Sequence, residues 1–161
     1  MSKEETRDIT ETVSWDRIIT LAKDLARQIE STNYIPDIIL AISRGGWVPG
    51  RLLSDYLGIE TLADITINTK VRTPSYVLNK KVLIVDDIAD SGKTLKKVME
   101  FAVNNMVKDL RTATLFYKTI SIIRPNWFAE ETEAWIIFPW EEYSWRRKHG
   151  EKITFRGANS C

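Results

Sequence analysis

The spacing of apolar residues along the chain predicts helices that alternate with strands. Large apolar residues recur every three or four positions after Ser14, after Pro49 and after Thr94, which is the spacing of one helix face. Ser14 is a suitable N-cap for the first of these helices, and Gly58 is placed to end the second. Near-continuous or alternating apolar runs predict the strands. These runs cover residues 37–42, 60–67, 82–85, 112–118 and 133–138.

The order of these elements predicts the fold class. Strands and helices alternate from residue 37 to residue 118, which requires right-handed crossovers and gives a parallel sheet. We therefore expect a single α/β domain over residues 1–161, with a central, mostly parallel sheet flanked by helices. Ligands bind such sheets at the carboxyl ends of the strands. Candidate chemistry is therefore expected where the predicted strands end.

Composition and charge exclude several classes of function. The chain has 43% hydrophobic and 28% charged residues, and its formal net charge of +1 gives no general attraction to nucleic acids or anionic membranes. No apolar run approaches the roughly 20 residues that span a bilayer. Residues 1–7 also lack the apolar core of a signal peptide. We expect a cytoplasmic protein with no membrane partner and no nucleic-acid partner.

The chain has one cysteine, Cys161, and one histidine, His149. A single cysteine excludes an intrachain disulfide, and a single histidine disfavours a His–Cys zinc site and a Ser–His–Asp triad. The available chemistry is therefore that of carboxylates, hydroxyls and backbone groups.

The most informative stretch is residues 82–95. Its apolar start predicts a central strand buried on both faces, which we expect to end at Asp86 and Asp87. Residues 90–94, Asp-Ser-Gly-Lys-Thr, then supply small and hydroxyl-bearing groups at the start of a helix, where backbone N–H groups bind phosphate. A pair of acids is therefore expected beside an anion site.

Residues 92–94 also match the end of a nucleoside-triphosphate P-loop, Gly-x-x-x-x-Gly-Lys-Ser/Thr. The position five residues before Gly92 is Asp87 instead of glycine, and this carboxylate would repel the phosphates that a P-loop binds. The dinucleotide fingerprint Gly-x-Gly-x-x-Gly does not follow any predicted strand. Neither nucleotide-binding class accounts for the stretch.

Residues 82–95 resemble the signature of the type I phosphoribosyltransferases, which is an apolar strand, two acids, two spacer residues and then Asp-Thr/Ser-Gly-x-Thr. The resemblance implies that the chain binds phosphoribosyl diphosphate (PRPP). Asp86 and Asp87 would then hold the ribose hydroxyls, partly through Mg²⁺ or its waters, because a diol needs acceptors. The implied 5′-phosphate site is the loop formed by Asp90, Ser91, Gly92, Lys93 and Thr94.

The loop after the predicted strand 37–42 is similar to the pyrophosphate loop of the same family. Glycines allow the backbone to come close to a ligand, and Arg44 offers a forked cation to phosphate oxygens. The resemblance implies that the pyrophosphate leaving group is bound by Ser43, Arg44, Gly45 and Gly46.

The second half of the chain resembles the 6-oxopurine branch, which includes the xanthine–guanine and hypoxanthine–guanine phosphoribosyltransferases. Lys118, at the end of the strand 112–118, is similar to the lysine that contacts the exocyclic oxygen O6. Residues 135–141 resemble a Trp-Ile-x-x-Pro-Trp-Asp segment in which the tryptophan stacks on the purine and the following backbone reads its edge, with glutamate here in place of aspartate. The implied base-binding residues are Lys118, Trp135, Ile136 and Glu141.

The resemblance implies transfer of the 5-phosphoribosyl group from PRPP to N9 of guanine, hypoxanthine or xanthine, with release of pyrophosphate. Mg²⁺ is the implied cofactor. Asp90 is the implied acceptor of the purine N7 proton, and Arg44 and Lys70 would assist departure of pyrophosphate. The basic segment 68–81 is either a mobile lid or a solvated hairpin.

Two alternatives stay open. One is a PRPP-binding regulator that acts on RNA or DNA, which the basic run Arg146, Arg147 and Lys148 favours and the low net charge disfavours. The other is a phosphoribosyltransferase for adenine, orotate or uracil. For the purine enzyme that the resemblance implies, we expect a small hood over the base site at residues 125–145, a basic tail at residues 146–161 and a homodimer.

Overall fold

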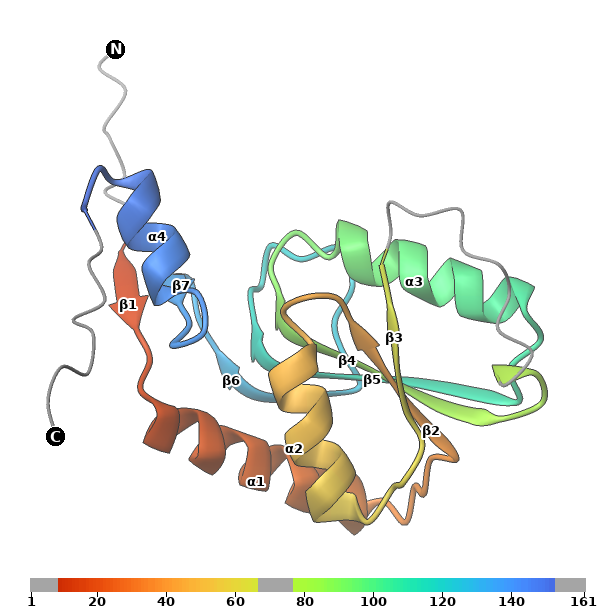
Figure 1. Cartoon of the computed structure of the whole chain (residues 1–161). Coiled ribbons are helices and arrows are strands. Elements are labelled where there is room, and N and C mark those ends of the chain that lie inside the picture. The colour runs from red at the N-terminus through yellow and green to blue at the C-terminus, as the bar shows by residue number, and fades with distance from the viewer. Residues whose placement is uncertain (1–8, 67–76, 153–161) are drawn as a thin grey trace, which may run out of the picture. The chain divides into compact units, whose positions relative to one another are not determined.

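The computed structural model describes residues 9–66 and 77–152, which form two compact units (Figure 1). The main unit comprises Ile18–Glu133. The terminal unit combines both ends of the chain, Met1–Arg17 and Ala134–Cys161, of which residues 9–17 and 134–152 are described.

The main unit is built on a five-stranded sheet in which all pairings are parallel. The strands are β2 (Ile38–Ile42), β3 (Leu62–Ile65), β4 (Lys81–Ala89), β5 (Asp109–Tyr117) and β6 (Trp127–Glu131). Their order in the sheet is β3-β2-β4-β5-β6, which places β4 in the centre. The predicted α/β class with a parallel sheet is confirmed. Because the strands are parallel, their carboxyl ends lie along one edge.

Helices flank this sheet on both faces, as predicted. Figure 1 shows α3 (Lys93–Asn104) on one face and α1 (Trp15–Ser31) and α2 (Trp47–Leu57) on the other. A Cβ on Gly50 of α2 would lie 3.0 Å from the Ala41 Cβ, so α2 packs closely on β2. Both faces of the central strands are therefore buried, which explains why their sequences are apolar without interruption.

Alternate residues of the central strands form the core beneath α3. Each large aliphatic side chain buried in this way stabilises the fold by about 1.5–3 kcal/mol. The main members of this core are Ile38, Leu40, Ile42, Val82, Ile84, Leu95, Val98 and Ala102.

The terminal unit has its own small sheet and aromatic cluster. It pairs β1 (Thr10–Thr12) in parallel with β7 (Trp135–Ile137), and α4 (Glu142–Lys148) follows. The Phe138 ring stacks on Trp140 with centroids 4.7 Å apart, and Trp15 lies 5.8 Å from the same indole. Of the aromatic side chains in the predicted hood, Phe138 and Trp140 therefore contribute to the packing of this unit.

The predicted helix ends are confirmed. The Arg17 N–H donates to the Ser14 hydroxyl at 3.2 Å, and Gly58, with φ of 65°, ends α2. The predicted end of the central strand is wrong: β4 continues through the two acids to Ala89, because Asp86 and Ile88 still pair with β5.

The sequence pattern does not predict β6 or α4. β6 is an edge strand whose residues are only partly buried, so it lacks an apolar run. α4 has seven residues, the last three of which are the first residues of the predicted basic tail. An i,i+4 ion pair between Glu142 and Arg146 (3.5 Å) supports this helix. Among the helices of the described ranges, none is long and apolar enough to cross a membrane.

Tyr34 lies at the amino end of the sheet. Its hydroxyl donates to the Val82 carbonyl at 3.1 Å, and its ring lies 5.4 Å from the Trp127 ring. Burial raises the pKa of the Tyr34 phenol, Asp109 raises it further, and Arg111 partly opposes the rise. The fold therefore favours the neutral phenol.

This shift predicts a loss of stability at high pH. Because the folded pKa lies above the unfolded value of about 10, the neutral phenol contributes fully below that pH, and its contribution is lost as the pH rises further. We expect the free energy of unfolding, measured with urea between about pH 9 and about pH 11, to fall less steeply for Tyr34→Phe than for the wild type. Tyr143→Phe, which removes a hydroxyl from a side chain that is 47% exposed, is the control. Equal slopes for Tyr34→Phe and the wild type would contradict this account.

Candidate active site

Three of the candidate segments lie at the carboxyl edge of the sheet in the main unit. Residues 43–46 follow β2, Asp86 and Asp87 lie near the end of β4, and Lys118 follows β5. β4 is paired with both β2 and β5. The sheet therefore brings the three segments together, although they are far apart in the sequence.

The loop of residues 43–46 packs against β4 with no room for side chains at its glycines. A Cβ on Gly45 would overlap the Asp87 carboxylate and lie 2.6 Å from its Cγ. A Cβ on Gly46 would overlap the Val85 carbonyl oxygen and lie 2.7 Å from the Ile42 nitrogen. Glycine is needed here for close approach, and the loop backbone therefore lies directly against Asp87 of the acid pair, Asp86 and Asp87.

Ser43 contacts a carboxylate that the sequence pattern does not single out. Its hydroxyl donates to Asp64 Oδ2 at 2.6 Å, and its N–H donates to the Ile65 carbonyl at 2.8 Å. The peptide bond between Ser43 and Arg44 is cis. Asp64 lies near the carboxyl end of β3, so the tendency of ligand sites to form at strand ends is the signal that points to it.

The acid pair is buried in the last half of the central strand β4, with 9% of Asp86 and 8% of Asp87 exposed. The Asp87 N–H donates to Asp86 Oδ1 (2.9 Å), and the Ile88 N–H donates to Asp87 Oδ1 (2.8 Å). Burial of carboxylates is costly unless donors or cations compensate. Mg²⁺ is commonly held by one or two carboxylates, with water and phosphate oxygens as its other ligands. The pair therefore fits a Mg²⁺ that binds together with a phosphate-bearing substrate.

The phosphate loop, residues 90–94, runs from β4 into the first turn of α3. Gly92 has φ of 74°, which favours glycine, and its carbonyl accepts the Lys96 N–H at 2.9 Å. The Lys93 N–H lies 3.4 Å from Ser91 Oγ. The first N–H groups of a helix lack intrahelical acceptors, and the helix dipole favours an anion beside them. The loop therefore offers backbone donors and hydroxyls to a phosphate.

Lys118 connects the loop after β5 to the phosphate loop. Its Nζ lies 3.2 Å from Asp90 Oδ1, and its N–H donates to the Ala89 carbonyl at 3.0 Å. The Lys118 side chain is 11% exposed, whereas that of Asp90 is 46% exposed. The ion pair presents a hydrogen-bond donor and a proton acceptor side by side to a ligand that approaches from solvent.

The other candidates lie in the terminal unit or outside the described ranges. Trp135 is 53% exposed, Ile136 is buried, and Glu141 directly precedes α4. Lys70 and residues 68–76 of the predicted lid lie outside the described residues. The structure therefore brings together the candidates for PRPP and Lys118, and it describes the aromatic candidates within their own unit.

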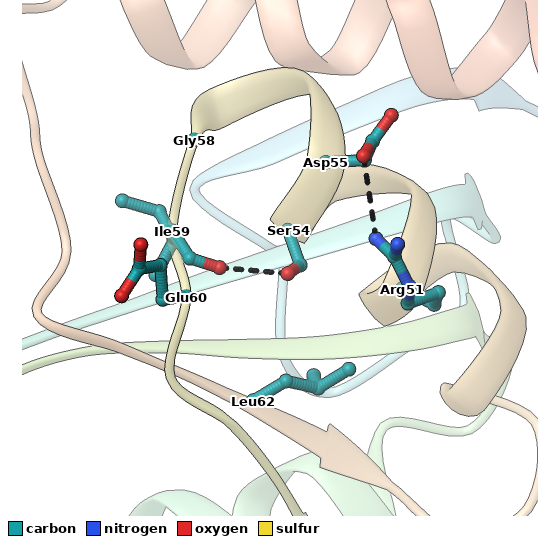
Figure 2. A pocket seen from close by; sticks show the side chains of 7 residues that line it. All are labelled: Arg51, Ser54, Asp55, Gly58, Ile59, Glu60 and Leu62. Atoms are coloured by element: carbon teal, nitrogen blue, oxygen red, sulfur yellow. Dashed lines mark hydrogen bonds and ion pairs between the residues drawn. The ribbon is translucent and has the colours of Figure 1, made fainter.

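A hollow of about 540 Å³ lies between the end of α2 and the start of β3 (Figure 2). Arg51 and Asp55 form an ion pair in it (3.6 Å), and the Ser54 hydroxyl donates to the Ile59 carbonyl (2.7 Å). Because the hollow is at the amino end of β3, it is not at the edge where parallel sheets bind ligands, and none of the candidate residues lines it. Its lining residues are Arg51, Ser54, Asp55, Gly58, Ile59, Glu60 and Leu62.

Gly45→Ala tests the contact between the loop and the acid pair. The added Cβ would displace the Asp87 carboxylate, so we expect Mg²⁺-dependent PRPP binding, measured by calorimetry, to weaken by about ten-fold or more. Gly58→Ala is the control, because its Cβ would meet open space while its φ of 65° is unfavourable for alanine. It should lower the melting temperature and leave PRPP binding unchanged. Wild-type PRPP affinity in Gly45→Ala would show that the contact is unimportant.

Known proteins resemble this chain over most of its length. The xanthine-guanine phosphoribosyltransferase of Nitratidesulfovibrio vulgaris is 32% identical over 142 residues, which cover 80% of this chain and 83% of that protein. The protein of the same name from Cereibacter sphaeroides is 30% identical over 149 residues, which cover 80% of this chain and 85% of that protein.

A solved structure and a domain family agree with these relatives. The purine phosphoribosyltransferase of Pyrococcus horikoshii matches with a TM-score of 0.75 and 28% identity, over 91% of this chain and 98% of that chain. Residues 9–144, which span both units, match the phosphoribosyl transferase domain family. Together with the acid pair and phosphate loop at the carboxyl edge of the sheet, these matches show that the chain belongs to the phosphoribosyl transferase family.

Proposed function

We propose that this protein is a purine-salvage enzyme that transfers the 5-phosphoribosyl group from PRPP to N9 of guanine, hypoxanthine or xanthine and releases pyrophosphate. The observation that carries the proposal is the meeting of the acid pair, the loop 43–46 and the Lys118–Asp90 ion pair at one edge of the sheet. Family membership and relatives named as xanthine-guanine enzymes support the same reaction.

The phosphate loop, the acid pair and the loop 43–46 would bind the three polar parts of PRPP. The phosphate loop would bind the 5′-phosphate through backbone N–H groups and hydroxyls. Asp86 and Asp87 would accept from the ribose hydroxyls and hold Mg²⁺, the cofactor that we propose, which would neutralise charge on the departing pyrophosphate. The loop 43–46 would bind the pyrophosphate itself, with Arg44 as its cation. Because Gly45 lies against Asp87, the proposed pyrophosphate and ribose sites would be adjacent.

In the reaction, the bond between C1′ and the pyrophosphate oxygen breaks, and a bond between C1′ and N9 forms. Cationic character develops on the ribose as the leaving group departs, as in glycoside hydrolysis. Arg44 and Lys70 would stabilise the negative charge on pyrophosphate. Asp90 would accept the N7 proton of the purine, which would weaken its ion pair with Lys118, and the lysine would donate to O6. We further propose that the part of the segment 68–81 that precedes Val77 closes over the site and excludes water. The expected lid is too long at its carboxyl end, because Val77 is buried in the core and Lys81 begins β4.

We further propose Trp135, Ile136 and Glu141 as base contacts, which the resemblance of residues 135–141 to the family segment supports. The exposed indole of Trp135 would stack on the purine, and the backbone at Ile136 and Glu141 would read its edge. We further propose that the enzyme is a homodimer and that it is cytoplasmic.

A regulator that acts on RNA or DNA is less well supported. Of its basic run, Arg146 forms ion pairs with Glu142 (3.5 Å) and Glu151 (2.5 Å). The hydrogen bond with Glu151 raises the pKa of Arg146. Part of the positive charge is therefore neutralised locally. RNA binding in a gel shift, without nucleotide formation from any base, would favour the regulator over the enzyme.

The base assignment predicts a selective effect of Asp90→Asn. The amide keeps the shape of the side chain but cannot accept the N7 proton, so we expect turnover to fall by about 10²- to 10⁴-fold while the dissociation constant for PRPP changes by less than about three-fold. Asp55→Asn, at a carboxylate in the hollow away from the site, is the control and should keep wild-type turnover. Unchanged turnover in Asp90→Asn would remove the base assignment.

The proposed activity is tested with a panel of nucleobases incubated with PRPP and Mg²⁺. We expect pyrophosphate release with at least one of guanine, hypoxanthine and xanthine, and little with adenine, because Lys118 can donate to a 6-oxo group but not to a 6-amino group. Little release is also expected with orotate or uracil, because a pyrimidine has no N7 whose proton Asp90 could accept. A folded protein that binds PRPP and releases no pyrophosphate with any 6-oxopurine would disprove the proposal.

A further inference from the structure

Residues 118–123, here called the 118–123 turn, lie against the phosphate loop. The Ile122 N–H donates to the Ser91 carbonyl at 3.1 Å. The Ser121 hydroxyl fills the space beside Gly92: a Cβ on Gly92 would overlap it and would lie 2.8 Å from the Ile123 nitrogen. The phosphate loop is therefore contacted from outside at two successive residues.

The 118–123 turn is itself held in shape. The Ser121 N–H donates to the Lys118 carbonyl at 3.0 Å, and the Ser121 hydroxyl donates to the Ile123 carbonyl at 2.8 Å. The turn begins at Lys118, whose own N–H is bonded to Ala89, next to Asp90. Backbone hydrogen bonds therefore connect the 118–123 turn to the residue before Asp90, Ala89, and to the residue after it, Ser91.

The contact at Ser91 has a direct consequence for anion binding. The Ser91 carbonyl and the Gly92 N–H belong to one planar peptide unit, in which they point in opposite directions. A hydrogen bond that fixes the carbonyl therefore also fixes the direction of the N–H. Gly92 has φ of 74° and is free of a Cβ, so without the bond this peptide unit could rotate at low cost.

We infer that Ser121 and Ile122 are positioning residues for the 5′-phosphate site. Ile122 fixes the peptide plane between Ser91 and Gly92, and Ser121 packs over Gly92 and closes the turn that presents the Ile122 N–H. Neither residue needs to touch the substrate. The inference rests on the proposed binding of the 5′-phosphate by residues 90–94.

The test compares two ligands that occupy different parts of the site. Guanosine 5′-monophosphate carries the 5′-phosphate, whereas inorganic pyrophosphate with Mg²⁺ reports on the loop 43–46. We expect Ser121→Ala to raise the dissociation constant for guanosine 5′-monophosphate by about five-fold, the equivalent of one hydrogen bond. Ile122→Pro, which removes the N–H, should raise it by about ten-fold or more. The dissociation constant for pyrophosphate should stay within about two-fold for both variants.

Thr119→Ala is the matched control. It removes a hydroxyl from the same turn, but this hydroxyl donates to Glu133 at 2.5 Å instead of contacting the phosphate loop. Its affinity for guanosine 5′-monophosphate should equal that of the wild type. Thermal melts establish that all the variants are folded.

The outcomes separate this inference from the proposed function. If folded Ser121→Ala and Ile122→Pro bind guanosine 5′-monophosphate as the wild type does, or if they lose affinity for both ligands equally, the positioning role is wrong while the proposed function stands. If the wild type itself does not bind guanosine 5′-monophosphate, the assignment of the 5′-phosphate site is wrong, and the inference is overturned with it.

Discussion

The contact between the Asp87 carboxylate and the backbone at Gly45 is the constraint on which the rest of the candidate site depends. It requires a strand that carries a buried acid and a neighbouring loop that carries no side chain. The adjacency of β2 and β4 brings this acid and this loop together. Any side chain at position 45 would separate the acid pair from the loop, and the ribose and pyrophosphate sites proposed here would no longer be adjacent.

Burial of two carboxylates at the end of β4 is tolerated because the rest of the strand is embedded in the core. Val82 to Val85 are fully buried between helices on both faces, and this apolar burial stabilises the strand against the cost of desolvating its polar end. Neighbouring N–H groups also donate to the two acids. The polar groups of the site are therefore held by a rigid strand. Electrostatic stabilisation of a transition state requires polar groups that are fixed in this way.

Helix ends and buried strands could be predicted because their signals are local. Ser14 and Gly58 each act within one turn of a helix, and an uninterrupted apolar run shows that both faces of a strand are covered. The length of β4 could not be predicted in this way, because Asp86 and Asp87 are polar and still pair with β5. β6 was missed for a related reason: pairing between backbones leaves little trace in the side chains of an edge strand.

For this protein, the amino-acid sequence by itself determined the fold class, the family resemblance and the identity of the acid pair and phosphate loop, because these depend on neighbouring residues and on local conformation. Only the tertiary structure decided which distant residues complete the site. Asp64 supports Ser43, and Ser121 packs over Gly92, at separations of 21 and 29 positions along the chain. Such contacts arise from strand order and loop packing, which periodicity and motif spacing do not encode.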